Sequence, residues 1–69
     1  MQNLFAQRLK ELREEQGLSM SNMAKQMGIS HAQISCWEAG TRSPLMESII
    51  ALCKFFNVSA DYLIGLSDH

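Results

Sequence analysis

The sequence has few of the features that crosslink or anchor small proteins. It contains two cysteines, and Cys36 and Cys53 form neither a CxxC motif nor a zinc-like spacing with histidine. We therefore expect two reduced thiols, no disulfide, no metal site and a cytoplasmic location. No apolar run is long enough to span a membrane, and no basic-then-apolar leader precedes the first predicted helix, so neither a membrane anchor nor secretion is expected.

An excess of basic residues is also missing. Six lysines and arginines stand against seven acidic residues, which gives a formal net charge of -1, whereas nucleic-acid-binding domains usually carry a basic footprint. Position matters more than the sum, because between Leu18 and Met46 the charged residues are Lys25, Arg42 and Glu38. The middle of the chain is therefore mildly basic, which predicts modest non-specific affinity for a polyanion.

Catalytic motifs are lacking as well. The sequence offers no serine-histidine-acid arrangement, no glycine-rich phosphate loop and no acid pair within a predicted pocket. We expect a binding module rather than an enzyme, with no cofactor and no small-molecule ligand.

What the sequence does contain is helical periodicity. Its 69 residues suffice for one domain, 1–69, near the lower size limit of a single apolar core. We predict an all-α, five-helix domain without strands, since apolar residues recur at spacings of three and four between capping residues. The predicted helices cover residues 3–16, 20–27, 30–39, 45–56 and 60–64.

Capping residues define the predicted helix starts. Ser19, Ser30 and Ser59 are good N-caps, and Ser43 with Pro44 is expected to begin the fourth helix as a cap and a first-turn proline. The predicted core residues occupy one face of each helix: Phe5, Leu9, Leu12, Met23, Ala24, Met27, Ile29, Ile34, Trp37, Leu45, Ile49, Leu52, Phe56 and one or both of Leu63 and Ile64.

The stretch MAKQMGISHAQISCWEAG, residues 23–40, predicts two short helices joined by an abrupt turn at Gly28. Two helices joined by a three- to four-residue turn with glycine form a helix-turn-helix, in which the first crosses the DNA backbone and the second enters the major groove. An ordinary helical hairpin within a bundle is the alternative. The outward positions of the second helix are predicted to be His31, Ala32, Ser35 and Cys36.

The pattern A-x-x-x-G-I-S-x-x-x-I-S-x-W-E-x-G-x-R-x-P over residues 24–44 resembles the lambda-repressor-like class, which includes Cro, phage repressors and the XRE group. The resemblance extends to RLKxLR at 8–13, GLS at 17–19 and VSADYLI at 58–64. It therefore covers nearly the entire chain. It implies a helix-turn-helix at about 20–39, with 30–39 as the recognition helix.

The resemblance also implies residue roles. Arg13 and Glu38 match an ion pair, and Met20 stands where relatives often have a phosphate-binding glutamine. The implied base contacts are His31, Ala32, Gln33 and Cys36. The implied phosphate contacts are Arg13, Ser19, Met20, Ser35, Thr41, Arg42 and Ser43.

Several alternatives stay open at this point. Gln33 fits the capping box S-x-x-Q with Ser30 as well as a base contact. A solvated surface position is the alternative for His31, for which a base or phosphate contact is the preferred interpretation. Lys25 fits either a phosphate contact or an ordinary solubilising charge. Cys36 fits a small residue on the helix surface better than a redox-sensitive thiol.

Together these features predict a sequence-specific DNA-binding transcriptional regulator, a repressor related to phage or prophage regulators. A single recognition helix reads only a few base pairs, so we expect a homodimer on a near-palindromic operator in double-stranded DNA. The predicted dimer interface is Tyr62, Leu63, Ile64 and Leu66. The alternative is a protein-interaction module that keeps the fold but has lost DNA binding, as Met20 and the acidic balance suggest.

Overall fold

Five α-helices and no strand make up residues 4–65, the part of the chain that this computed structural model describes. The helices are α1 (Leu4–Glu15), α2 (Met20–Met27), α3 (His31–Ala39), α4 (Met46–Phe56) and α5 (Ala60–Ile64). The predicted all-α, five-helix fold is confirmed, and the observed bounds lie within one residue of the predicted ones, although Asn3 falls outside the described residues.

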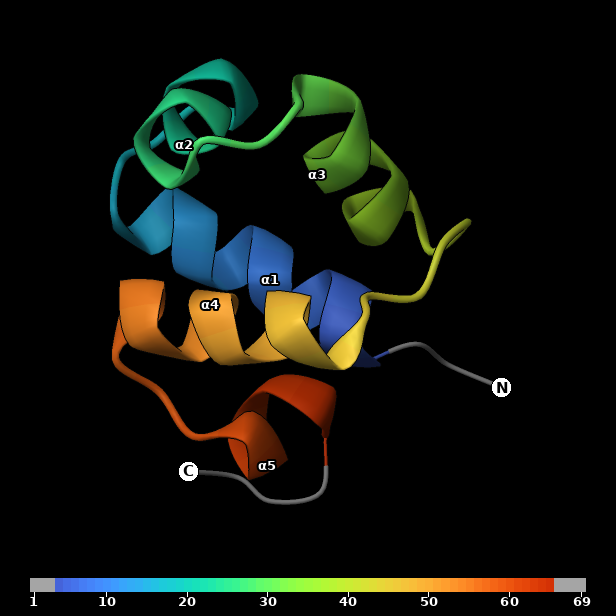
Figure 1. Cartoon of the computed structure of the whole chain (residues 1–69). Helices are drawn as coiled ribbons and strands as arrows, with labels where there is room; N and C mark the ends of the chain where they lie inside the picture. Colours follow the sequence, from blue (N-terminus) through green and yellow to red (C-terminus); the bar gives the residue numbers. More distant parts are fainter. Residues whose placement is uncertain (1–3, 66–69) are drawn as a thin grey trace.

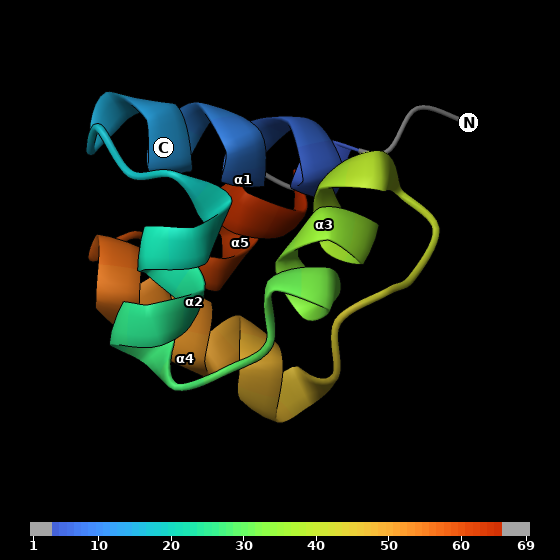
Figure 2. The same cartoon turned by 90° about the horizontal axis from the view of Figure 1, so that it is seen from above.

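The helices form three levels around one core. Figure 1 shows α2 and α3 at one end, α1 and α4 in the middle and α5 at the other end, and Figure 2 shows α2 beside α3, with α1 and α4 on opposite sides of them. Each helix contributes one completely buried side chain, namely Leu9, Met23, Ile34, Leu52 and Leu63. Because all five meet in a single cluster, α2 and α3 are held as part of the core rather than as a separate hairpin.

Three serines begin helices as their sequence positions predict. The hydroxyl oxygens of Ser19, Ser30 and Ser59 accept hydrogen bonds from backbone N–H groups three residues later, at Asn22, Gln33 and Tyr62. Each such cap satisfies one of the N–H groups that a helix start leaves without an intrahelical acceptor. These short helices therefore start at residues fixed by local chemistry.

The start of α4 differs from the prediction. The helix begins at Met46, its N-cap is Leu45, and no side-chain hydrogen bond caps it. Ser43 is exposed, and Leu45 is 68% exposed instead of buried. Leu45 has an extended backbone, with φ -75° and ψ 162°, so its side chain does not follow the helical period that places Leu52 and Phe56 in the core. The predicted Ser43–Pro44 start and the buried Leu45 were wrong.

Two further features are lacking in the described part of the chain. Within 4–65, no helix combines the length and apolar character needed to cross a membrane. In the same range, no group of three or more histidine, cysteine or acidic side chains is placed to hold a metal ion.

Candidate nucleic-acid interface

A left-handed glycine makes the turn between α2 and α3. Gly28 has φ 71°, a conformation that disfavours residues with a Cβ. The N–H groups of Gly28 and Ile29 both point to the carbonyl oxygen of Ala24, which ends α2 within two residues. Ser30 then caps α3, so only Gly28, Ile29 and Ser30 separate the two helices (Figure 2).

A capping box fixes the first turn of α3. Ser30 Oγ accepts the Gln33 N–H at 3.2 Å, and Gln33 Oε1 accepts the Ser30 N–H at 3.2 Å. The capping role of Gln33 is thus present in the structure. Next to it, His31 and Ala32 are exposed in the first turn.

The inner side of α3 is anchored by large apolar residues. Ile34 is completely buried and Trp37 nearly so. The Trp37 ring meets Phe5 of α1 edge to face, with 6.4 Å between ring centroids. One turn after the start of the helix, Ser35 and Cys36 are half-buried.

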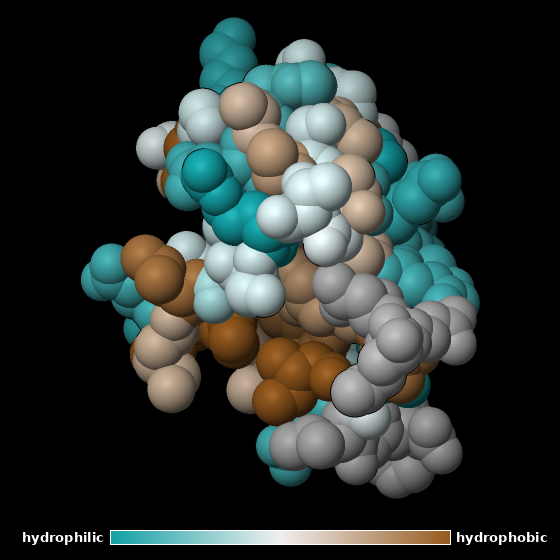
Figure 3. Space-filling view, turned by 90° about the vertical axis from the view of Figure 1, so that its right-hand side faces the viewer, coloured by the Kyte–Doolittle hydropathy of each residue, from teal (hydrophilic) through white to brown (hydrophobic). Residues whose placement is uncertain are grey.

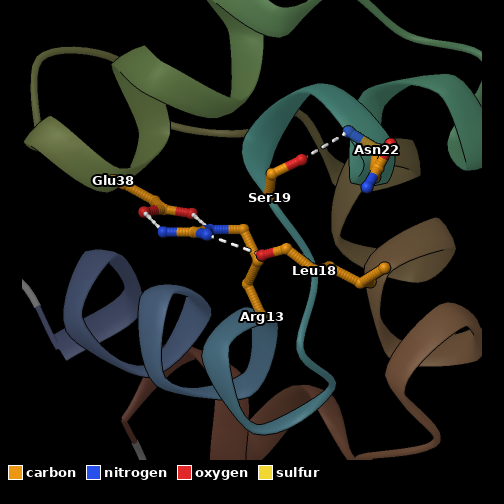
Figure 4. A network of polar contacts seen from close by, with 5 residues as sticks. All are labelled: Arg13, Leu18, Ser19, Asn22 and Glu38. Atoms are coloured by element: carbon orange, nitrogen blue, oxygen red, sulfur yellow. Dashed lines mark hydrogen bonds and ion pairs between the residues drawn. The ribbon is translucent and has the colours of Figure 1, made fainter.

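An ion pair joins α1 to the end of α3 (Figure 4). Arg13 Nε donates to Glu38 Oε2 at 2.7 Å, and Arg13 Nη2 donates to Glu38 Oε1 at 3.1 Å. The third nitrogen, Nη1, donates to the carbonyl oxygen of Leu18 at 2.8 Å. The structure therefore brings the predicted pair together and adds the loop before α2 as a third anchored segment.

The Arg13–Glu38 ion pair is largely buried. The side chains of Arg13 and Glu38 are 11% and 4% exposed. The hydrogen bonds from Arg13 to Glu38, more than the charge of Glu38, raise the pKa of Arg13. Little of the guanidinium remains exposed for the phosphate contact that was also predicted for Arg13.

The first turn of α2 offers backbone rather than side-chain donors. Ser19 Oγ is the cap acceptor for Asn22, and Met20 is half-buried against the core. The thioether of Met20 is at most a weak acceptor, so a phosphate here would bind the free N–H groups and positive dipole of the helix start.

The loop after α3 is tied back to the helix at its first residue. Thr41 donates to the carbonyl oxygen of Cys36 twice, through its N–H at 3.1 Å and its hydroxyl at 3.3 Å. Arg42 and Ser43 follow on the surface. Arg42 is thus an exposed cation on a short, anchored loop directly beyond α3.

The predicted dimer residues do not share one environment. Leu63 is completely buried, so its assignment to a dimer interface was wrong, because it closes the core of its own chain. Tyr62 is half-buried under the Arg8 guanidinium, which lies 4.4 Å from the ring centroid. Ile64 is 40% exposed, and Leu66 lies outside the described residues.

An apolar surface that the sequence patterns did not predict accompanies α4. Leu45, Met46 and Ile50 are large exposed hydrophobic residues, as is Ile64 on α5. Figure 3 views the side on which α4 begins and α5 ends, and apolar surface gathers there. The available signal was Ile50, which directly follows the inward-facing Ile49 and so falls outside the core period of α4.

Comparisons with known proteins agree with this geometry. A family model described as helix-turn-helix matches residues 9–63. YobD of Bacillus subtilis, named as a helix-turn-helix-type transcriptional regulator, is 32% identical over 65 residues, which cover 94% of this chain and 58% of YobD. The transcriptional activator BcrR of Enterococcus faecalis is 38% identical over 61 residues, covering 88% of this chain and 30% of BcrR. This chain thus spans less than two thirds of either relative.

Structural similarity extends to a DNA complex. The crystal structure of the c2 repressor of Salmonella phage P22 with a synthetic operator superposes with a TM-score of 0.82 at 30% identity, covering 91% of this chain and 96% of that one. The relatives are named as regulators of transcription and not as enzymes, in agreement with the predicted non-enzymatic role. The chain belongs to the XRE-type helix-turn-helix family, as the resemblance to phage repressors implied.

Proposed function

We propose that this protein is a sequence-specific DNA-binding transcriptional regulator and that α3 is its recognition helix. The observation that carries the proposal is the contrast between the two sides of α3. Ile34, Trp37 and the Arg13–Glu38 pair fix its inner side, whereas His31 and Ala32 are exposed at its start. A rigid helix with an exposed first turn is what reading base edges in a major groove requires.

The side chains assigned to base contacts differ in the chemistry that they offer to DNA. The ring nitrogens of His31 can donate to or accept from a base edge, and the Ala32 methyl suits a thymine methyl. Cys36 and the amide of Gln33 are further candidates for base contacts. Phosphate contacts are assigned to the start of α2 at Ser19 and Met20, to Ser35, and to the loop residues Thr41, Arg42 and Ser43, which would orient the domain without reading sequence.

A dimer on a near-palindromic operator is proposed because a single recognition helix contacts only a few base pairs. Two copies would place their recognition helices about 34 Å apart, one turn of duplex. Repression is the simpler mode of action, because a repressor needs only to occupy its operator. A promoter-reporter assay decides the direction of regulation, which matters because the relative BcrR is named as an activator.

Selection from a randomised duplex library tests the proposal. The wild type should enrich an inverted repeat, and a variant with His31→Ala and Ala32→Gln should enrich a different half-site while its thermal unfolding stays close to the wild type. Glu15→Gln, an exposed change on α1, is the control and should leave the selected motif unaltered. An unchanged motif in the double variant would exclude α3 as the reader, and no enrichment by the wild type would favour a protein-interaction module.

A further inference from the structure

The outward face of α4 carries an ordered pattern of charge and apolar surface. Glu47, Ile50, Ala51 and Lys54 are all exposed and are spaced by three, four and seven residues, so they lie along one stripe. The acid stands toward the helix start, the base toward its end, and the apolar pair lies between them. Among residues 4–65, neither charged side chain has a hydrogen-bonding or ion-pairing partner.

We infer that a second copy of this chain docks on this stripe, with the two α4 helices antiparallel about a two-fold axis that passes between Ile50 and Ala51. This inference adds an interface to the dimer of the proposed function, and its biological role rests on that proposed function. It also moves the interface from α5 to α4, because Leu63 belongs to the core.

Charge order selects this partner and this orientation. In an antiparallel pair centred between residues 50 and 51, Glu47 of one copy lies opposite Lys54 of the other, and the same contact recurs through the symmetry. A parallel pair in register would instead place like charges opposite each other. The stripe is therefore complementary to itself, which an unrelated protein partner would not require.

Shape supports the same partner. The small Ala51 permits close approach of a second helix, and Ile50 of that helix can pack over it as a knob enters a hole. A hollow of about 240 Å³ borders the stripe, lined by Glu47, Ser48 and Ala51 of α4 and by Met27, Ile29 and Trp37 of the helix-turn-helix. Met46, 75% exposed, lies one turn from Ile50 and widens the apolar surface.

The size of the apolar surface predicts a weak dimer. A standard stable interface buries about 800 Å² per partner over 20–30 residues, far more residues than this stripe supplies. The free chain should dimerise weakly, and binding of both half-sites of an operator should shift the equilibrium to the dimer by mass action.

Charge reversal in the 69-residue chain tests the geometry. Sedimentation equilibrium of the wild type should show a monomer–dimer equilibrium, and Glu47→Lys or Lys54→Glu alone should weaken dimerisation about tenfold or more, since like charges then face each other. An equimolar mixture of the two variants should dimerise again, because the antiparallel pairing juxtaposes opposite charges in the mixed pair. Circular dichroism of each variant verifies that the fold is kept.

The matched control separates specific pairing from general attraction. Glu15→Lys mixed with Lys10→Glu combines the same two charge reversals on α1 and should show no gain in dimer. A wild type that is monomeric both free and on an inverted-repeat duplex would overturn the inference, as would a mixture of the α4 variants that stays monomeric. The proposed function is tested separately, because a monomeric variant that still enriches the half-site in library selection retains DNA reading.

Discussion

The guanidinium of Arg13 on α1 donates two hydrogen bonds, of 2.7 and 3.1 Å, to the carboxylate of Glu38 on α3. Its third nitrogen donates to the carbonyl oxygen of Leu18. One guanidinium thus fixes α1, the loop before α2 and the end of α3 at once. The planar fork of arginine suits this arrangement, and a lysine could not reproduce it.

Removing Glu38 should therefore destabilise the fold. Glu38→Ala leaves the buried Arg13 guanidinium with only the Leu18 carbonyl, so we expect a loss of about 1–3 kcal/mol in the free energy of unfolding, measured by urea denaturation. Glu38→Gln should lose less, because the amide oxygen still accepts one bond. The exposed control Glu15→Ala should stay within about 0.5 kcal/mol of the wild type. Equal stability of Glu38→Ala and that control would refute the structural role of the pair.

Gly65, the C-cap directly after α5, lies close to Leu4, the first residue of α1. A Cβ at Gly65 would lie 2.8 Å from Leu4 Cδ1, and Gly65 also has φ 90°. Gly28 has φ 71°, but a Cβ at that position would meet no atom within 4 Å. Gly28→Ala should cost about 1–2 kcal/mol from backbone strain alone, and Gly65→Ala should cost more.

Thermal unfolding of both variants tests this ranking. Leu4→Gly should make the Gly65→Ala substitution less costly, because it removes both Leu4 Cδ1 and Leu4 Cβ, which would lie 2.8 and 2.9 Å from the new Cβ, while leaving the cost of Gly28→Ala unchanged. Additive effects of Leu4→Gly and Gly65→Ala would show that the two residues do not press on each other.

Local patterns predicted helix starts well where a side chain decides them. Ser19, Ser30 and Ser59 cap their helices as expected. The pattern Ser43–Pro44 has the same local appearance, yet α4 begins at Met46. Leu45 is the N-cap and has the same extended backbone as the three serines, but its side chain makes no cap hydrogen bond. No side chain therefore decides where α4 begins, and a pattern of capping residues could not place this start.

Long-range relationships were less accessible from periodicity. Arg13 and Glu38 are separated by 25 residues, and only the resemblance to phage repressors indicated their pairing. Leu63 and Ile64 are adjacent apolar residues in a five-residue helix, too short for a period to show which one faces inward. Docking of α5 on α1, where Arg8 covers Tyr62, decides this in favour of Leu63.

The thiol of Cys53 provides a pH-dependent prediction. Cys53 is half-buried on α4, and desolvation raises its pKa above the reference value of 9.0. In a Cys36→Ser variant, alkylation of Cys53 by iodoacetamide should follow a pH-rate profile whose midpoint lies higher in the native chain than in urea, since the thiolate is the nucleophile. Coincident midpoints would contradict the assigned effect of burial.

The same shift has a defined sign in stability. Because the folded chain holds this proton more tightly than the unfolded chain, the contribution of Cys53 is complete below the unfolded pKa and is lost as the pH rises through the folded pKa. Cys53→Ser should therefore show a smaller decline in the free energy of unfolding over that alkaline range than the wild type, measured by urea denaturation in a pH series.

Substitution of Arg42 distinguishes a contact to the DNA phosphates from a contact to the bases. It is exposed on the loop that Thr41 ties to α3, so its charge should neutralise one phosphate regardless of sequence. Arg42→Gln should weaken binding to specific and random duplexes by the same factor and reduce the slope of log K against log salt by about 0.9. Fluorescence anisotropy over a salt series measures both quantities, and Lys10→Gln, the same charge loss on α1, is the control. A loss confined to the selected operator would instead make Arg42 a base reader, and an unchanged slope would remove it from the interface.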